Sequence, residues 1–131
     1  MSTFHLQIVT PDGAFYDGEA ESLVVHAIDG DVCIMANHIP YVTALGTGEA
    51  RVTVNGEKRR AAASGGMLTV SSERVRLVAT TFEWAEDIDA ARAQRARAAA
   101  EERLQNARDA AEIQLAKAKL TRALVRIKVA Q

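Results

Sequence analysis

The stretch EWAEDIDAARA, residues 83–93, marks the point where the pattern of this chain changes. Before it, apolar residues alternate in short runs that are separated by Gly, Pro and Asn. After Glu86 the chain contains neither Gly nor Pro, alanine dominates, and apolar residues recur at helical spacing. The change predicts two domains, a β domain over residues 1–86 and a helical domain over residues 87–131.

Turn sequences divide the first domain into short predicted strands. Pro11-Asp12-Gly13 is a strong turn signal, and Asn55-Gly56 between two alternating runs predicts a β-hairpin. The nearly continuous apolar run Leu23–Ile28 predicts a strand and is compatible with burial on both of its faces. Ser64-Gly65-Gly66 predicts a turn or bulge that separates two strands. The eight to ten strands that result, with regular turns, are typical of an all-β sandwich.

The second domain is predicted to begin near Asp87, with Asp87 as N-cap and Asp89 in the first turn. Asn106 and Asp109 are suited to end one helix and begin another. Nothing there forbids a continuous helix of about 66 Å, so a folded hairpin and an extended rod both remain open. Small residues in the seam bury little apolar area, which predicts weak helix pairing. The predicted seam residues are Ala93, Ala96, Ala100, Leu104, Ala107, Ile113, Ala116, Leu120, Ala123, Ile127 and Ala130.

Composition narrows the function classes. The net charge is −1, which gives no general attraction to nucleic acid or anionic lipid. The two domains differ, because residues 1–86 carry a net charge of −5 and residues 87–131 a net charge of +4. The single cysteine, Cys33, is typical of a reducing compartment. We expect neither a signal peptide at the start of this sequence nor a membrane-spanning segment in it, so any membrane role comes through a partner.

No enzyme or metal constellation is visible in the sequence. The three histidines, His5, His26 and His38, are scattered, and the cysteine has no partner at metal-ligand spacing. We therefore expect no catalysis by this chain alone. Trp84, the only tryptophan, is expected to close one end of the sandwich.

Two charged pairs in the helical domain have an ordinary and a functional interpretation. Asp89 and Arg92 are three residues apart, and Arg122 and Arg126 are four apart, so each pair shares a helix face. The ordinary interpretation is a surface ion pair and a solvated basic face. In a folded hairpin the four residues would meet at one end, where an arginine pair beside a helix start suits phosphate groups.

Four segments in fixed order resemble the epsilon subunits of bacterial F-type ATP synthases, which are called delta in mitochondria. They are Val9–Gly13, Gly30–Pro40, Ser64–Gly66 and Glu86–Ala93, and the resemblance covers the whole chain. It implies an N-terminal ten-stranded β-sandwich, which binds the gamma subunit and the c-ring. It also implies a C-terminal antiparallel hairpin of two helices, which is regulatory.

The function that the resemblance implies is that of a non-catalytic rotor subunit in the central stalk. Such a subunit couples proton transport to ATP synthesis, and it inhibits ATP hydrolysis when its helices extend toward the alpha and beta subunits of the catalytic head. It lies on the cytoplasmic face of the bacterial membrane, held there only through the complex. The loop that contains Asp31 and His38 would face the c-ring and gamma. Cys33 and Ala36 replace a Gly and a Pro that are usual in this loop.

Some members of the family bind ATP or MgATP as a regulatory ligand, which keeps the helices folded. Their signature I/L-D-x-x-R-A occurs here at residues 88–93, and Ala99 replaces a further basic residue. The residues that the resemblance assigns to the nucleotide are Glu83, Ile88, Asp89, Arg92, Ala93, Arg122 and Arg126.

Two other functions fit parts of the pattern. A free-standing adaptor could use a β-sandwich with a coiled-coil tail, since this kind of fold does not dictate function. A nucleic-acid regulator could use the basic tail, but interleaved aromatic residues are missing there and the first domain is acidic, so we expect no nucleic-acid partner.

Overall fold

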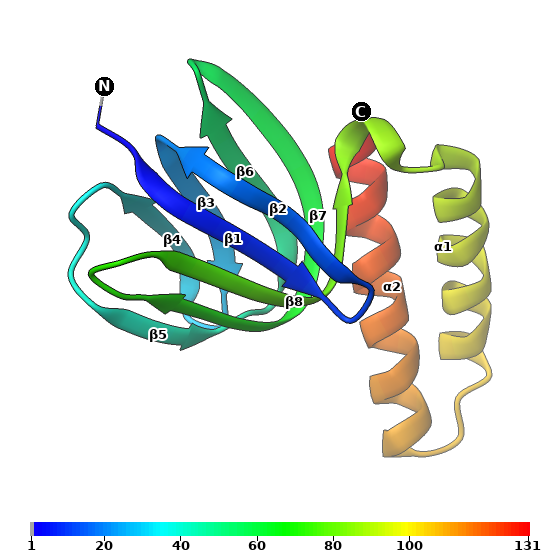
Figure 1. Ribbon diagram of the computed structural model, residues 1–131. Coiled ribbons are helices and arrows are strands. Elements are labelled where there is room, and N and C mark those ends of the chain that lie inside the picture. Colours follow the sequence, from blue (N-terminus) through cyan, green and yellow to red (C-terminus); the bar gives the residue numbers. More distant parts are fainter. Residues whose placement is uncertain (1) are drawn as a thin grey trace. The chain divides into compact units, whose positions relative to one another are not determined.

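A computed structural model describes residues 2–131 and shows two compact units, one that ends at Trp84 and one that spans Ala85–Gln131 (Figure 1). The first unit is a β-sandwich and the second consists of helices. None of the helices in the described part of the chain is long and apolar enough to cross a membrane.

The first unit contains eight strands among the described residues. In the sheet, the strands follow the order β2-β1-β8-β7-β6-β3-β4, and β5 pairs with β7 outside this path. All pairs are antiparallel except β1 with β8. The strands are β1 Phe4–Thr10, β2 Gly13–Ala20, β3 Ser22–Ala27, β4 Gly30–Met35, β5 Tyr41–Ala44, β6 Thr47–Val54, β7 Glu57–Val70 and β8 Val75–Trp84.

The expected count of ten strands is therefore not confirmed, and β7 gives the main reason. This strand continues through Ser64-Gly65-Gly66, where the sequence predicted a turn or bulge between two strands. It pairs with β6 before the two glycines and with β5 after them, while β8 stays paired along both parts. Gly65 and Gly66 have φ angles of 69° and 104°, so the glycines let one strand bend and change its partner without ending.

The strand β3 differs from the prediction for Leu23–Ile28. Leu23, Val25 and Ala27 are buried, whereas His26 is exposed and Ile28, beyond the end of the strand, is 67% exposed. The strand is thus buried on one face only, so burial on both faces, with which its sequence is compatible, is not found. A short apolar run did not distinguish these cases, because Val24 and Ile28 are apolar but lie toward solvent.

The core lies between the inner faces of the strands. Its largest fully buried side chains in this unit are Leu6, Ile8, Leu23, Ile34, Leu68, Leu77, Val25 and Val52. Trp84 belongs to the same cluster, with its ring centroid 5.0 Å from that of Phe82. The guanidinium of Arg59 lies 3.8 Å from the centre of the Trp84 ring, which is close enough for a cation–π interaction.

The second unit begins with a 3₁₀ turn, η1 Ala85–Asp87, followed by α1 Ala90–Gln105 and α2 Ala110–Ala130. Asp89 is the N-cap of α1, so the prediction of Asp87 as N-cap is wrong, because Asp87 belongs to η1. Asn106 and Asp109 cap α1 and α2 as predicted. Of the two arrangements left open, the structure therefore shows the folded hairpin, with the helices antiparallel (Figure 1).

Alanines line the contact between the two helices. Ala93 and Ala100 of α1 and Ala116 and Ala123 of α2 are buried, and six further residues of the predicted seam are half-buried. Ala96 is exposed and does not belong to it. The half-buried Arg97 lies four residues after Ala93, and its Nε atom is buried without a hydrogen-bond partner among the described residues.

Candidate functional site

The hairpin brings together most of the residues that the resemblance assigns to a nucleotide. Residues 88–93 form the entry and the first turn of α1, while Arg122 and Arg126 lie in the last turns of α2. Because the helices are antiparallel, these segments share the open end of the hairpin, away from the connecting turn (Figure 1). Glu83 is half-buried on β8 and belongs to the first unit.

Asp89 has a structural task at the start of α1. Its Oδ1 accepts a hydrogen bond from the backbone amide of Arg92 at 3.0 Å, and its backbone carbonyl accepts one from Ala93 at 3.0 Å. The carboxylate thus satisfies an amide that a helix start leaves unpaired, and its charge suits the positive end of the helix dipole. The side chains of Asp89 and Arg92 are both exposed and accessible to a ligand.

Ile88 and Ala93 carry no charge and contribute to the structure of the hairpin. The amide of Ile88 donates to the carbonyl of Ala85 at 3.3 Å, which closes the turn that leads into α1. Ala93 is 3% exposed and lies in the helix seam, where its small side chain permits close approach of α2. Ile88 therefore belongs to the entry of α1 and Ala93 to the contact between the helices.

Arg122 and Arg126 add positive charge to the open end. They are four residues apart on α2, half-buried, and therefore on one face of the helix. The helix carries five basic residues and one acidic residue, Glu112. Two guanidinium groups on one face can bind phosphate oxygens by charge-assisted hydrogen bonds.

Asp31 and His38, predicted together as an interface, lie at opposite ends of β4. Asp31 is the second residue of the strand, and the amide of His38 donates to the carbonyl of Met35, the last residue, at 3.2 Å. Four residues of strand separate Asp31 from Met35, about 13 Å. Nδ1 of His38 donates to the carbonyl of Ile39 at 2.7 Å, which fixes the imidazole against the loop. The two residues can therefore contact different parts of a partner, or different partners.

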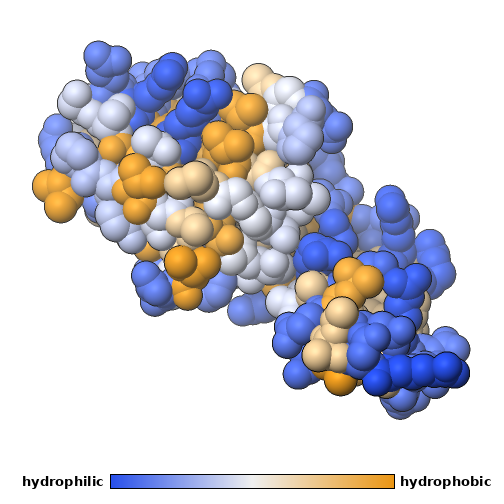
Figure 2. Space-filling view, turned by 90° about the horizontal axis from the view of Figure 1, so that it is seen from below, coloured by the Kyte–Doolittle hydropathy of each residue, from blue (hydrophilic) through white to orange (hydrophobic). Residues whose placement is uncertain are grey.

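An exposed apolar row on the sandwich was missed in the sequence analysis. Ala44, Met67, Val78 and Val9 are aligned across the adjacent strands β5, β7, β8 and β1, and we call this row the outer stripe. Met67 is 49% and Val78 41% exposed, and the exposed Val42 lies on the same face of β5 as Ala44. Figure 2 shows apolar side chains among polar ones on the surface of the first unit. Apolar residues at outward positions were the available signal, but their alignment depends on the strand register.

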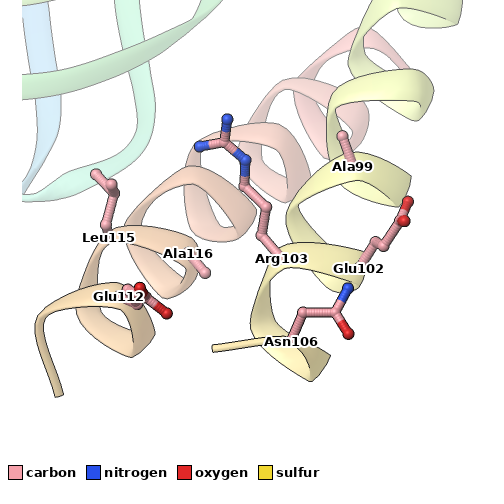
Figure 3. A pocket seen from close by; sticks show the side chains of 7 residues that line it. All are labelled: Ala99, Glu102, Arg103, Asn106, Glu112, Leu115 and Ala116. Carbon is pink, nitrogen blue, oxygen red and sulfur yellow. The ribbon is translucent and has the colours of Figure 1, made fainter. Parts of the chain in front are cut away.

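A pocket near the connecting turn of the hairpin also escaped prediction. It has a volume of about 500 Å³, and Figure 3 shows Arg103 reaching from α1 toward α2 at its centre. Acidic, basic and apolar side chains line it together, so it presents no single ligand chemistry. None of the predicted nucleotide residues belongs to it. Its lining residues are Ala99, Glu102, Arg103, Asn106, Glu112, Leu115 and Ala116.

One carboxyl group of the first unit has a clearly altered acidity. The hydrogen bond between the His5 ring and Asp17 lowers the pKa of Asp17, against a smaller opposing effect of desolvation. The two residues lie on the neighbouring strands β1 and β2, far in sequence from every predicted site residue. Their contact therefore contributes to stability at neutral pH rather than to a candidate site.

Comparison with known proteins gives matches over both units. The profile of the family described as "ATP synthase, Delta/Epsilon chain, beta-sandwich domain" matches residues 3–85, and "ATP synthase, Delta/Epsilon chain, long alpha-helix domain" matches residues 86–131.

Groups of three or more side chains that could hold a metal ion are not found in residues 2–131.

Individual proteins with related sequences or folds agree with these profiles. The ATP synthase epsilon chain of Alkaliphilus oremlandii (strain OhILAs) is 47% identical over 103 residues, 79% of this chain and 77% of that one. The epsilon chain of Caldicellulosiruptor bescii is 37% identical over 131 residues, 100% of this chain and 96% of that one. A chain in the Euglena gracilis mitochondrial ATP synthase structure, described as OSCP/F1/c-ring, has the same fold with a TM-score of 0.81 at 20% identity, over 92% of this chain and 77% of that one.

Proposed function

The chain belongs to the delta/epsilon family of ATP synthase subunits, as a non-catalytic stalk subunit, and we propose that it has two tasks in the complex. Its sandwich binds the gamma subunit and the c-ring, so that rotation driven by protons reaches the catalytic head. Its helices regulate ATP hydrolysis. Family membership leaves no reason to retain the free-standing adaptor.

The outer stripe supports the first task. Aligned apolar side chains on the solvent side of a sheet mark a protein-binding surface more often than chance exposure. We assign the stripe to gamma, and Asp31 and His38, at the two ends of β4, to the c-ring and gamma. The similar Euglena chain comes from an assembly that contains F1 and the c-ring. The chain would reach the cytoplasmic face of a bacterial membrane only through these partners.

The partner assignment can be tested with Met67→Asp in the outer stripe. A buried charge opposite gamma should weaken binding of the purified chain to a gamma–c-ring complex by a hundredfold or more, since an unpaired buried charge is costly. Glu57→Lys, at the exposed β6–β7 hairpin, is the control and should bind like the wild-type chain. Equal affinity of Met67→Asp and wild type would refute the role of the stripe.

The alanine seam supports the second task. Four of the five buried apolar residues in the helices are alanines, which bury much less apolar area than leucines would, and we propose that the folded hairpin is only weakly preferred over an open form. In the proposed open form, the basic α2 contacts the alpha and beta subunits and blocks ATP hydrolysis. In the folded form that the structure shows, the helices leave the head accessible.

We propose that ATP or MgATP selects the folded form. The observation that carries this is the shared open end, where the antiparallel hairpin places the exposed Asp89 and Arg92 at the same end as Arg122 and Arg126. Because Asp89 already caps α1, the phosphates would bind the arginines rather than the helix start. Ile88 lies in the turn that leads into α1, and the buried Ala93 lies in the helix seam.

Titration with MgATP tests the nucleotide site. A ligand that binds only the folded hairpin raises the midpoint of thermal unfolding, and Trp84, the only tryptophan, reports changes near the junction of the units. Arg126→Ala should abolish most of the rise. Lys117→Ala, which removes the same charge from α2 nearer the connecting turn, should retain it. If the wild-type chain shows no change at millimolar MgATP, nucleotide sensing is wrong, while the stalk function stands.

A further inference from the structure

His26 and Asp31 face each other across the β3–β4 hairpin on its outer side. They are register partners, and Nδ1 of His26 lies 3.0 Å from Oδ1 of Asp31. Both side chains are accessible, 45% for His26 and 63% for Asp31. One carboxylate oxygen thus accepts a hydrogen bond within the sheet, while the exposed carboxylate can still accept another from outside.

The neighbouring strand leaves room for the imidazole. Gly46 and Gly48 lie beside His26, and a Cβ atom added at Gly48 would lie only 2.5 Å from the Cβ of His26. The amide of Gly46 also donates to the carbonyl of His26 at 3.0 Å, which ties the two backbones together. Neither glycine has a positive φ, so their lack of a side chain matters here more than their backbone freedom.

We propose that His26 is a positioning residue, which holds the Asp31 carboxylate in place for a hydrogen-bond donor of the c-ring. This rests on the proposed contact between Asp31 and the ring. An exposed aspartate loses rotamer freedom when it binds a partner, and a side chain that is already held by His26 loses less. His26 therefore increases affinity without touching the ring itself.

The pairing can be measured in the full-length chain without a partner. Nitrogen-15 NMR at pH 8 distinguishes imidazoles that carry the proton on Nδ1 from those that carry it on Nε2. His26 should carry it on Nδ1 in the wild-type chain, because the Asp31 carboxylate accepts from that atom. In Asp31→Ala the proton should move to Nε2, with His5 and His38 unchanged. An Nε2 proton on His26 in the wild type would overturn the pairing.

Binding to a gamma–c-ring complex tests the consequence. His26→Leu should weaken binding about fivefold, and His26→Asn should restore most of it, because its amide nitrogen replaces Nδ1. The double variant His26→Leu/Asp31→Ala should bind no worse than Asp31→Ala alone.

Several outcomes would contradict the inference. Wild-type affinity in His26→Leu would show that His26 does not act through Asp31. The same conclusion would follow if the double variant lost as much binding free energy as the two single variants lose together. If the wild-type chain does not bind the complex at all, the proposed function is wrong, and NMR still decides whether the pair forms.

Discussion

Asp89 accepts a hydrogen bond from the backbone amide of Arg92, with 3.0 Å between Oδ1 and N. Asp109 makes the equivalent bond to the amide of Glu112 at 2.8 Å, at the start of α2. Both helices of the hairpin therefore begin with the same cap, but only the first belongs to the proposed nucleotide site. A comparison of Asp89 with Asp109 can therefore distinguish the capping role of an aspartate from a role in ligand binding.

Asp89→Ala and Asp109→Ala should each lower the free energy of unfolding by about 1 kcal/mol, because each leaves a helix amide unpaired. Only Asp89→Ala should also reduce the rise in unfolding temperature with MgATP, because the helix start that Asp89 caps carries Arg92 at the open end of the hairpin. Thermal unfolding with and without MgATP measures both effects. An equal loss of the ATP response in the two variants would mean that Asp89 acts only through helix stability.

Local signals in the sequence were sufficient to predict turns and helix ends where a single residue type determines the backbone conformation. Asn55 has a positive φ of 52° in the predicted Asn-Gly hairpin, and Asn106 and Asp109 end and begin helices as predicted. Asp87 and Asp89 show the limit of such signals. Both are good caps in isolation, and the 3₁₀ turn Ala85–Asp87 decides between them.

Features that depend on strand pairing could not be predicted. The sequence contains Gly65-Gly66 but not the information that β7 keeps β8 as a partner through both glycines. The outer stripe and the His26–Asp31 pair likewise depend on register between strands. At the candidate nucleotide site, the resemblance supplied the residues, and the folded hairpin supplied the common end that they share.

Ala123→Leu should open the hairpin. Ala123 is fully buried in the helix seam, and an enlarged side chain there costs about 1–3 kcal/mol through strain and displacement of α1. In the reconstituted synthase, this variant should inhibit ATP hydrolysis more strongly than the wild-type chain. Ala118→Leu, on the exposed side of the same helix, is the matched control, and a synthase that contains it should hydrolyse ATP at the wild-type rate. Equal rates for both variants would argue against an opening hairpin.

Acid should destabilise the sandwich partly through Asp17. Because its pKa is lowered in the folded chain by the hydrogen bond with His5, the unfolded chain binds this proton more readily. The stabilisation is complete above the ordinary pKa of aspartate, about 4, and is lost as the pH falls through the lowered value. Urea unfolding between pH 5 and pH 2 should therefore show a shallower pH dependence for Asp17→Asn than for the wild type. His5→Ala should have a similar effect, and the double variant should add little, unless the two residues act independently.

Gly66→Ala should prevent stable folding of the sandwich. Gly66 has a φ of 104°, and a Cβ atom there would lie 1.8 Å from the carbonyl oxygen of Val78 on β8. Neither the strand nor its partner can move away, because the carbonyl of Gly66 also accepts from the amide of Leu45 at 2.9 Å. Gly56→Ala is the control, with a φ of 79° but nothing within 4 Å of the added atom, so it carries only backbone strain of about 1–2 kcal/mol. Far-UV circular dichroism and thermal unfolding should show a folded Gly56→Ala chain and an unfolded or strongly destabilised Gly66→Ala chain. If the two variants were equally stable, the close approach of β7 to β8 would not be the reason that position 66 requires a glycine.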